Sequence, residues 1–94
     1  PPRLCWSRTF ASQTFGHYDR VADTVMISAS LDSRRVPLYV VDFVVYHELL
    51  HRKLAGEWRR GRKIDHTSRF RHEERLFGRY EPADAFLKKL ARAR

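Results

Sequence analysis

The first third of the chain alternates hydrophobic and polar residues. In residues 3–10, RLCWSRTF, the side chains of Leu4, Trp6 and Phe10 fall on one side at a period of two. Such alternation is typical of a half-buried strand. These residues therefore predict a strand near the start of the chain.

The same period returns in residues 16–32, GHYDRVADTVMISASLD. Four apolar residues occupy alternate positions there: Val25, Ile27, Ala29 and Leu31. The polar segment 19–23, DRVAD, suits a hairpin turn between two strands. We therefore expect one or two further strands and a small antiparallel or mixed β-sheet.

Beyond residue 37 the spacing of apolar residues becomes helical. Pro37 suits the first turn of a helix, because its missing N–H would have no partner there. One stripe of a helix over residues 38–55 would carry Val40, Val44, His47, His51 and Leu54. Gly56 is a plausible end for this helix.

Two more helices are expected after a break. Residues 56–65, GEWRRGRKID, predict a cationic loop. Asp65 then suits the N-cap of a helix over residues 66–77, which Gly78 ends. Residues 81–94, EPADAFLKKLARAR, predict a third helix with Pro82 at its start. The expected fold class is α+β, in one domain over residues 1–94.

The segment VVYHELLHRK, residues 44–53, carries the clearest chemistry. On a helix, residues four apart lie on the same face. His47 and His51 can therefore present two imidazole nitrogens to one zinc ion. Glu48 is rotated by about 100° from His47 and can reach a water on that ion as a general base. This is the logic of H-E-x-x-H in zinc peptidases, and the alternative is two core histidines without a metal.

A catalytic zinc needs a third protein ligand. His66 is the first choice, because it opens the next predicted helix after a loop long enough for that helix to fold back. Phe70 and Phe77 recur on the same face and can pack on the first helix. Glu73 would then orient a histidine or be the ligand itself, and Glu74 is a second alternative. The remaining histidines, His17 and His72, are interpreted as surface residues.

Composition sets further bounds. The chain has 94 residues, is 43% hydrophobic and contains one cysteine, Cys5. One cysteine excludes an internal disulfide and a four-cysteine zinc ribbon, and favours a reducing, cytoplasmic setting. No segment is long and apolar enough to predict a membrane span, and no signal-peptide pattern opens the chain.

Positive charge gathers in the second half of the chain. The net charge is +8, and residues 47–94 hold fourteen Lys and Arg against seven Asp and Glu. This asymmetry makes nucleic acid a candidate partner, and a non-enzymatic module binding nucleic acid or zinc is the alternative function. The candidate contacts are Arg52, Lys53, Arg59, Arg60, Arg62 and Lys63.

Taken in order, these segments resemble a known family. HELLH followed by 66–70, HTSRF, and preceded by FGHYDRVADTVMISASL and VPLYVVDFVVY, resembles the SprT-like zinc metallopeptidases and their YgjP-type relatives. The resemblance implies a zincin-like fold, zinc ligands His47, His51 and His66, and Glu48 as catalytic base. It also implies that residues 25–31 form an edge strand that binds an extended peptide. Some members digest proteins attached to DNA. Small single-domain gluzincins are a close competitor and would use Glu73 or Glu74 as the third ligand.

The expected reaction is hydrolysis of a peptide bond in a peptide or protein substrate. Zinc would polarise the carbonyl and activate a water, and Glu48 would take the proton and pass it to the leaving amine. Tyr80 or Tyr46 is a candidate to stabilise the oxyanion, although each is a candidate core aromatic as well.

Overall fold

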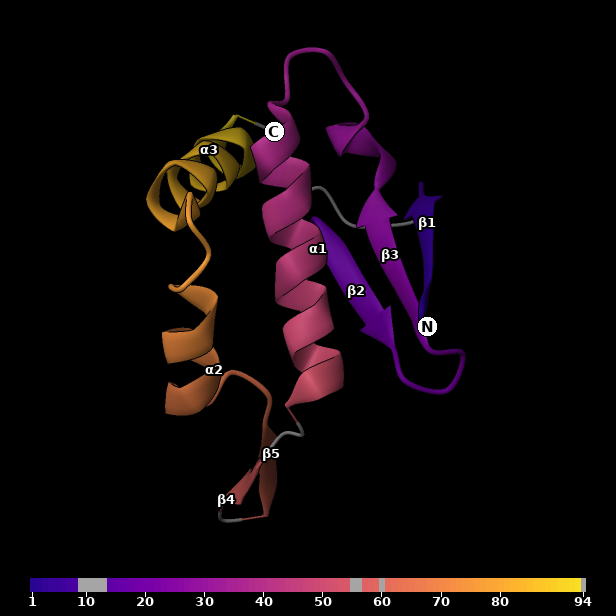
Figure 1. The fold of residues 1–94 in the computed structure, drawn as a ribbon, viewed down its shortest axis with the longest axis vertical. Helices are drawn as coiled ribbons and strands as arrows, with labels where there is room; N and C mark the ends of the chain where they lie inside the picture. The colour runs from indigo at the N-terminus through magenta and orange to yellow at the C-terminus, as the bar shows by residue number, and fades with distance from the viewer. Residues whose placement is uncertain (9–13, 55–56, 60, 94) are drawn as a thin grey trace.

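The protein is a small α+β structure in which one long helix lies between a sheet and two further helices. The computed structural model describes residues 1–8, 14–54, 57–59 and 61–93, and of residues 57–59, 62 and 63 it describes the backbone alone. Helix α1, Leu38–Lys53, occupies the centre, with the sheet on one side and helices α2, Ser68–Glu74, and α3, Tyr80–Arg92, on the other (Figure 1).

The sheet is mixed and has three strands in the order β1-β3-β2. Strand β2, Gly16–Asp19, and strand β3, Thr24–Ser28, form the expected hairpin, and β1, Arg3–Ser7, pairs with β3 in parallel. Strand β3 is therefore the central strand, and the expectation that residues 25–31 form an edge strand is wrong. Among the described strands, β2 and β1 are the edges.

The alternation in residues 25–31 reflects burial but not one continuous strand. Val25 and Ile27 are buried on β3, whereas Ala29–Leu31 form a short 3-10 helix, η1. The side chain of Ser28 accepts a hydrogen bond from the Ser30 N–H at the start of this turn. Leu31 is 1% exposed and joins Val25, Ile27 and Val44 in one core cluster.

Helix α1 is buried on much of its circumference. It packs against β2, β3, α2 and α3. Val44 faces the sheet cluster, and Leu50 forms a second cluster with Leu54 and Phe70 on the other side. The helix begins directly after Pro37 and ends at Lys53, with Leu54 already extended. Gly56, the expected end, lies outside the described residues.

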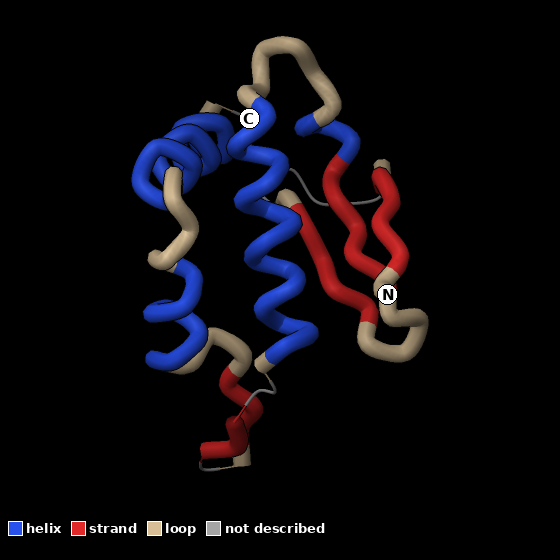
Figure 2. Tube along the Cα trace, in the orientation of Figure 1, coloured by secondary structure: helices blue, strands red, loops and turns tan. Residues whose placement is uncertain are grey.

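Residues 57–64 form a hairpin, not the predicted loop. Strands β4, Glu57–Arg59, and β5, Arg62–Ile64, pair in antiparallel register and project beyond the C-terminal end of α1 (Figure 2). Gly61 lies in the turn with φ of 76°, a conformation that costs glycine little because it has no Cβ. No helix among the described residues is long and apolar enough to cross a membrane.

The start of α2 also differs from the sequence-based expectation. Thr67, not Asp65, is the N-cap, and its Oγ1 accepts a hydrogen bond from the Phe70 N–H at 3.1 Å. His66 therefore lies just before the helix instead of inside its first turn. The helix ends at Glu74, before the expected Phe77.

Mutation can compare how much buried Leu31 and exposed Leu38 contribute to the stability of the protein. Leu31→Ala should lower the free energy of unfolding by about 2–4 kcal/mol, because it opens a cavity in the sheet cluster. Leu38, which is 74% exposed at the start of α1, is the matched control, and Leu38→Ala should change the same quantity by less than about 0.5 kcal/mol. Urea unfolding followed by circular dichroism measures both. Equal effects would contradict the assignment of Leu31 to the core.

Candidate metal centre

Helix α1 brings His47 and His51 together on one face. Their ring centroids are 5.0 Å apart. This follows from their spacing of four residues, which places side chains one turn apart on the same side of a helix. Neither ring is fully buried, so both can be reached from the space between α1 and the sheet.

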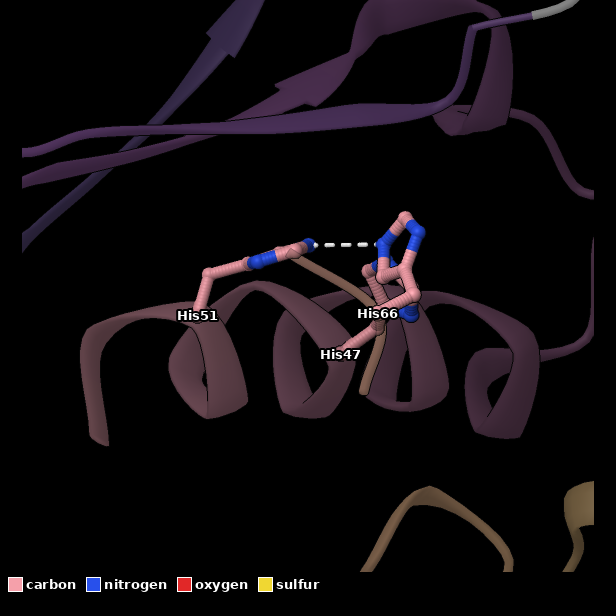
Figure 3. A group of neighbouring side chains, drawn as sticks. All are labelled: His47, His51 and His66. Carbon is pink, nitrogen blue, oxygen red and sulfur yellow. Dashed lines mark hydrogen bonds between the residues drawn. The ribbon is translucent and has the colours of Figure 1, made fainter. Parts of the chain in front are cut away.

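His66 completes the group from a segment distant in sequence. Its Nε2 lies 3.0 Å from Nε2 of His51, and one potential ligand atom from each of the three histidines lies within 4.8 Å of the others. Figure 3 shows the three rings gathered on the side of α1 that faces the strands. The structure thus brings together the three histidines that the sequence singled out.

Phe70 is the platform on which these rings pack. Its ring centroid lies 5.1 Å from that of His47, 4.6 Å from that of His51 and 5.0 Å from that of His66. Phe70 is 1% exposed and is fixed at the start of α2 by the Thr67 cap. The predicted packing of Phe70 on helix α1 is confirmed, and its ring contact with His66 links the position of His66 to the core.

The electrostatics favour neutral imidazoles. Burial, followed by repulsion from His47 and His66, lowers the pKa of His51 to about 4. Burial and the charge of His47 also lower the pKa of His66. Imidazole binds a metal only in its neutral form, so these two rings are ready for coordination at neutral pH.

The donor set fits a zinc ion. Zinc binds imidazole nitrogens at about 2.0–2.1 Å in a tetrahedral arrangement, which places neighbouring ligand nitrogens about 3.3–3.4 Å apart. The 3.0 Å separation of the His51 and His66 Nε2 atoms is close to this value. These two nitrogens are within hydrogen-bonding distance, so one of the two rings carries its proton on Nε2 when no metal is bound, whereas a cation between them would accept a lone pair from both.

Glu48 lies beside the histidines in a dry environment. The residue is 6% exposed, and its Oε2 is 4.0 Å from Nε2 of His47. Burial raises the pKa of Glu48 to about 7, against the opposing effect of His47. Strand β2 covers the carboxylate at Gly16, where an added Cβ would lie 2.8 Å from Oε2 and 2.7 Å from Cγ1 of Val44. Only glycine allows this close approach.

Glu74 holds the ring of His47 from behind. Its Oε2 forms a short hydrogen bond with Nδ1 of His47. A carboxylate can only accept, so Nδ1 carries the proton and Nε2 keeps the lone pair available to a metal. The orienting role suggested for Glu73 therefore falls to Glu74. Glu73 instead lies 3.8 Å from Nζ of Lys53, and its backbone carbonyl accepts from the Tyr46 hydroxyl.

An open hollow of about 410 Å³ lies between the histidines and β2. From β2 and the turn after it, Gly16, His17, Tyr18 and Arg20 line it. The turn is attached to the end of α1, because Nη2 of Arg20 donates to the His51 carbonyl at 2.8 Å and Nε of Arg52 donates to Asp23 at 2.8 Å. The site therefore has both a rigid wall and access from outside.

Several residues named from sequence lie away from this site or are otherwise engaged. Tyr80 packs edge-on against Phe43 at 5.6 Å and lines a separate depression at the start of α3. The Tyr46 hydroxyl is used by the Glu73 carbonyl, at 2.7 Å. The structure therefore brings neither tyrosine hydroxyl to the group of three histidines.

The candidate nucleic-acid contacts divide into two groups. Arg52 and Lys53 are exposed, and their side chains lie near Asp23 and Glu73 respectively. Arg60, together with the side chains of Arg59, Arg62 and Lys63, lies outside the described residues. Nucleic-acid binding thus stays a prediction.

Three residues at the site, His17, Arg20 and Gly16, were not predicted to belong to it. His17 was assigned to the surface, yet it lines the hollow although it is exposed. Arg20 was placed only in a turn. The role of Gly16 has a local signal, since a glycine at the start of a strand pattern indicates close approach of another backbone or side chain.

Comparison with protein-family models, with curated proteins and with solved structures returned no match.

The hydrogen bond from Glu74 can be tested through metal affinity. Glu74→Gln should weaken zinc binding by about 10- to 100-fold, because the ring of His47 loses its charged partner. Glu73→Gln, the neighbouring change on the same helix, should leave the affinity within about twofold. Competition with a chromophoric chelator measures both constants. Equal losses in the two variants would contradict the assignment.

The buried Glu48 carboxyl should also make the stability of chelator-treated protein depend on pH. Its pKa is about 7 in the folded state, above the ordinary value of 4.5 for a glutamate, so the folded state loses stability as pH rises from about 4.5 to about 7. Glu48→Gln removes this loss. It should therefore stabilise the protein by about 1–3 kcal/mol at pH 8 but not at pH 4.5.

Urea unfolding at the two pH values gives this comparison, with Glu81→Gln on exposed α3 surface as control. If the Glu48→Gln variant is less stable than the parent at pH 8, the buried carboxylate does not lower the free energy of unfolding.

Proposed function

We propose that the protein is a zinc-dependent peptidase with a zincin-like active site. The observation that carries this proposal is the convergence of His47, His51 and His66 beside the buried carboxylate of Glu48, next to an open hollow. Three imidazole nitrogen donors with open space on one side are typical of a catalytic zinc site, whereas structural zinc sites are closed by four protein ligands.

The choice of third ligand follows from the contacts of α2. Glu74 is bonded to His47, and Glu73 lies near Lys53. His66 is the residue whose ring meets both other histidines. This supports the three-histidine arrangement of the SprT-like family over the gluzincin alternative with a glutamate ligand. Zinc, when bound, would supply polarisation of a carbonyl and acidification of a water.

Glu48 is the general base in this proposal. Its carboxylate lies beside the histidine group and is shielded from bulk solvent by Gly16 and Val44. A water in the hollow can donate a proton to Glu48 as its oxygen attacks the peptide carbonyl. Glu48 then returns that proton to the leaving amine, so that one carboxyl serves both steps.

Strand β2 is the natural support for the substrate. It pairs with β3 on one side only, among the described strands, and its residues line the hollow. An extended peptide can add to the free edge of a sheet through backbone hydrogen bonds. We assign this role to β2 because β3, the strand first expected to fulfil it, is central.

A glutamine substitution tests the catalytic assignment. Glu48→Gln keeps the size of the side chain but removes the base, so zinc-loaded variant should cleave a denatured protein substrate at least about 100-fold more slowly than the parent. Its zinc content should stay at one ion per chain. Glu81→Gln should retain parental activity. Parental activity in Glu48→Gln, with zinc bound, would rule out the proposed role.

A further inference from the structure

The candidate site opens into two hollows that differ in chemistry. The hollow of about 410 Å³ extends along β2 toward Arg20, and a second of about 470 Å³ extends toward Phe15. Both are lined by Gly16, His47, Glu48 and His66. The proposed catalytic group therefore lies where the two meet, so a bound peptide would place residues on either side of it.

Arg20 gives the first hollow a cationic end. One nitrogen of its guanidinium donates to the His51 carbonyl, a neutral acceptor. The salt bridges among the described residues use Arg52, not Arg20, for Asp23. Arg20 is exposed and keeps further N–H donors for a carboxylate. His17 lies in the same wall, and two acidic residues, Glu48 and Asp65, also line this hollow.

The second hollow is mainly apolar. It lies between the residues before β2, helix α1 and helix α3, with the side chains of Phe15, Phe43, Val44 and Leu87 in its wall. Three carboxylates also line it. Glu48 is the proposed base, Glu74 binds His47, and Asp84 lies 2.8 Å from Nζ of Lys88. This hollow is suited to an apolar side chain, because a charged one would lose hydration there.

The direction of strand β2 determines which hollow receives the residues before the cleaved bond and which receives those after it. Strand β2 runs from Gly16 toward Asp19 and Arg20, and antiparallel pairing is more stable per residue than parallel pairing. A peptide antiparallel to β2 would place its N-terminal residues near Arg20 and its C-terminal residues near Phe15.

We propose that the cleft selects peptides with an acidic side chain shortly before the cleaved bond and a bulky apolar side chain directly after it. This inference rests on the proposed function and names its substrate class. The net charge of +8 acts in the same direction, because it draws acidic peptides toward the protein.

Binding to an inactive protein tests this preference separately from catalysis. Zinc-loaded Glu48→Gln protein is titrated into fluorescein-labelled peptides that carry Glu, Gln or Lys within three residues before a central bond, and Leu or Asn directly after it. The Glu–Leu peptide should bind about tenfold or more tightly than the Gln–Leu and Glu–Asn peptides, as expected for one charge-assisted contact and one buried side chain.

Charge reversal at Arg20 provides the matched comparison. Adding Arg20→Glu should remove the preference for Glu over Gln and favour the Lys peptide. Arg35→Glu makes the same charge change at an exposed position outside the residues lining either hollow, and should keep the preference. Equal binding of all peptides, or equal effects of the two reversals, would overturn the inference.

Cleavage by the zinc-loaded parent separates the two proposals. Cleavage of these peptides without a sequence preference would overturn the inference and leave the proposed function intact. Selective binding without any cleavage by the parent would overturn the proposed function but leave the inferred peptide preference intact. The C-terminal product of the Glu–Leu peptide should begin with Leu, and a C-terminal product that begins at another residue would contradict the proposed order.

Discussion

The candidate site depends on three imidazole rings held against one buried phenylalanine. The period of a single helix places His47 and His51 together. His66 lies in a different segment, between strand β5 and helix α2, and must be brought to them by the fold. Phe70 joins these two sources, because its ring contacts all three histidines while its backbone is fixed by the Thr67 cap. The core around Phe70 thus sets the geometry of the three histidines.

Without a metal this arrangement carries the cost of a buried carboxylate, because Glu48 is 6% exposed. The Nε2 atoms of His51 and His66 lie 3.0 Å apart, at hydrogen-bonding distance. A cation bound by these imidazoles would favour the charged form of Glu48. For a chain of 94 residues with a modest core, binding of zinc would add stability that the metal-free protein lacks. Function and folding would then share one interaction.

Local spacing explains which features could be predicted from the sequence. The pairing of His47 with His51 and the position of Glu48 beside them follow from the period of one helix. The hairpin of β2 and β3 follows from alternation around a polar turn. The coarse α+β class follows from the order of these patterns. His66 was predicted from its position after a loop, but the reason given was wrong, because Thr67 and not Asp65 caps α2.

Non-local pairing explains most of the remainder. Periodicity does not reveal that β1 joins the far side of β3, which turns the expected edge strand into a central one. Strands β4 and β5 are three residues each and rich in charge, so they show no useful alternation. Glu74 contacts His47 in place of the predicted Glu73. The two side chains point in directions about 100° apart around a short helix, and the packing of this helix against α1 decides which of them faces His47.

X-ray absorption at the zinc edge is the most direct test of whether three imidazoles of this chain hold one zinc ion. It is measured on protein loaded with one equivalent of zinc and dialysed. We expect three imidazole nitrogens at about 2.0–2.1 Å and at least one further light ligand. His66→Ala should reduce the imidazole contribution by one. Failure to retain zinc, or a coordination shell dominated by sulfur or carboxylate, would contradict this coordination.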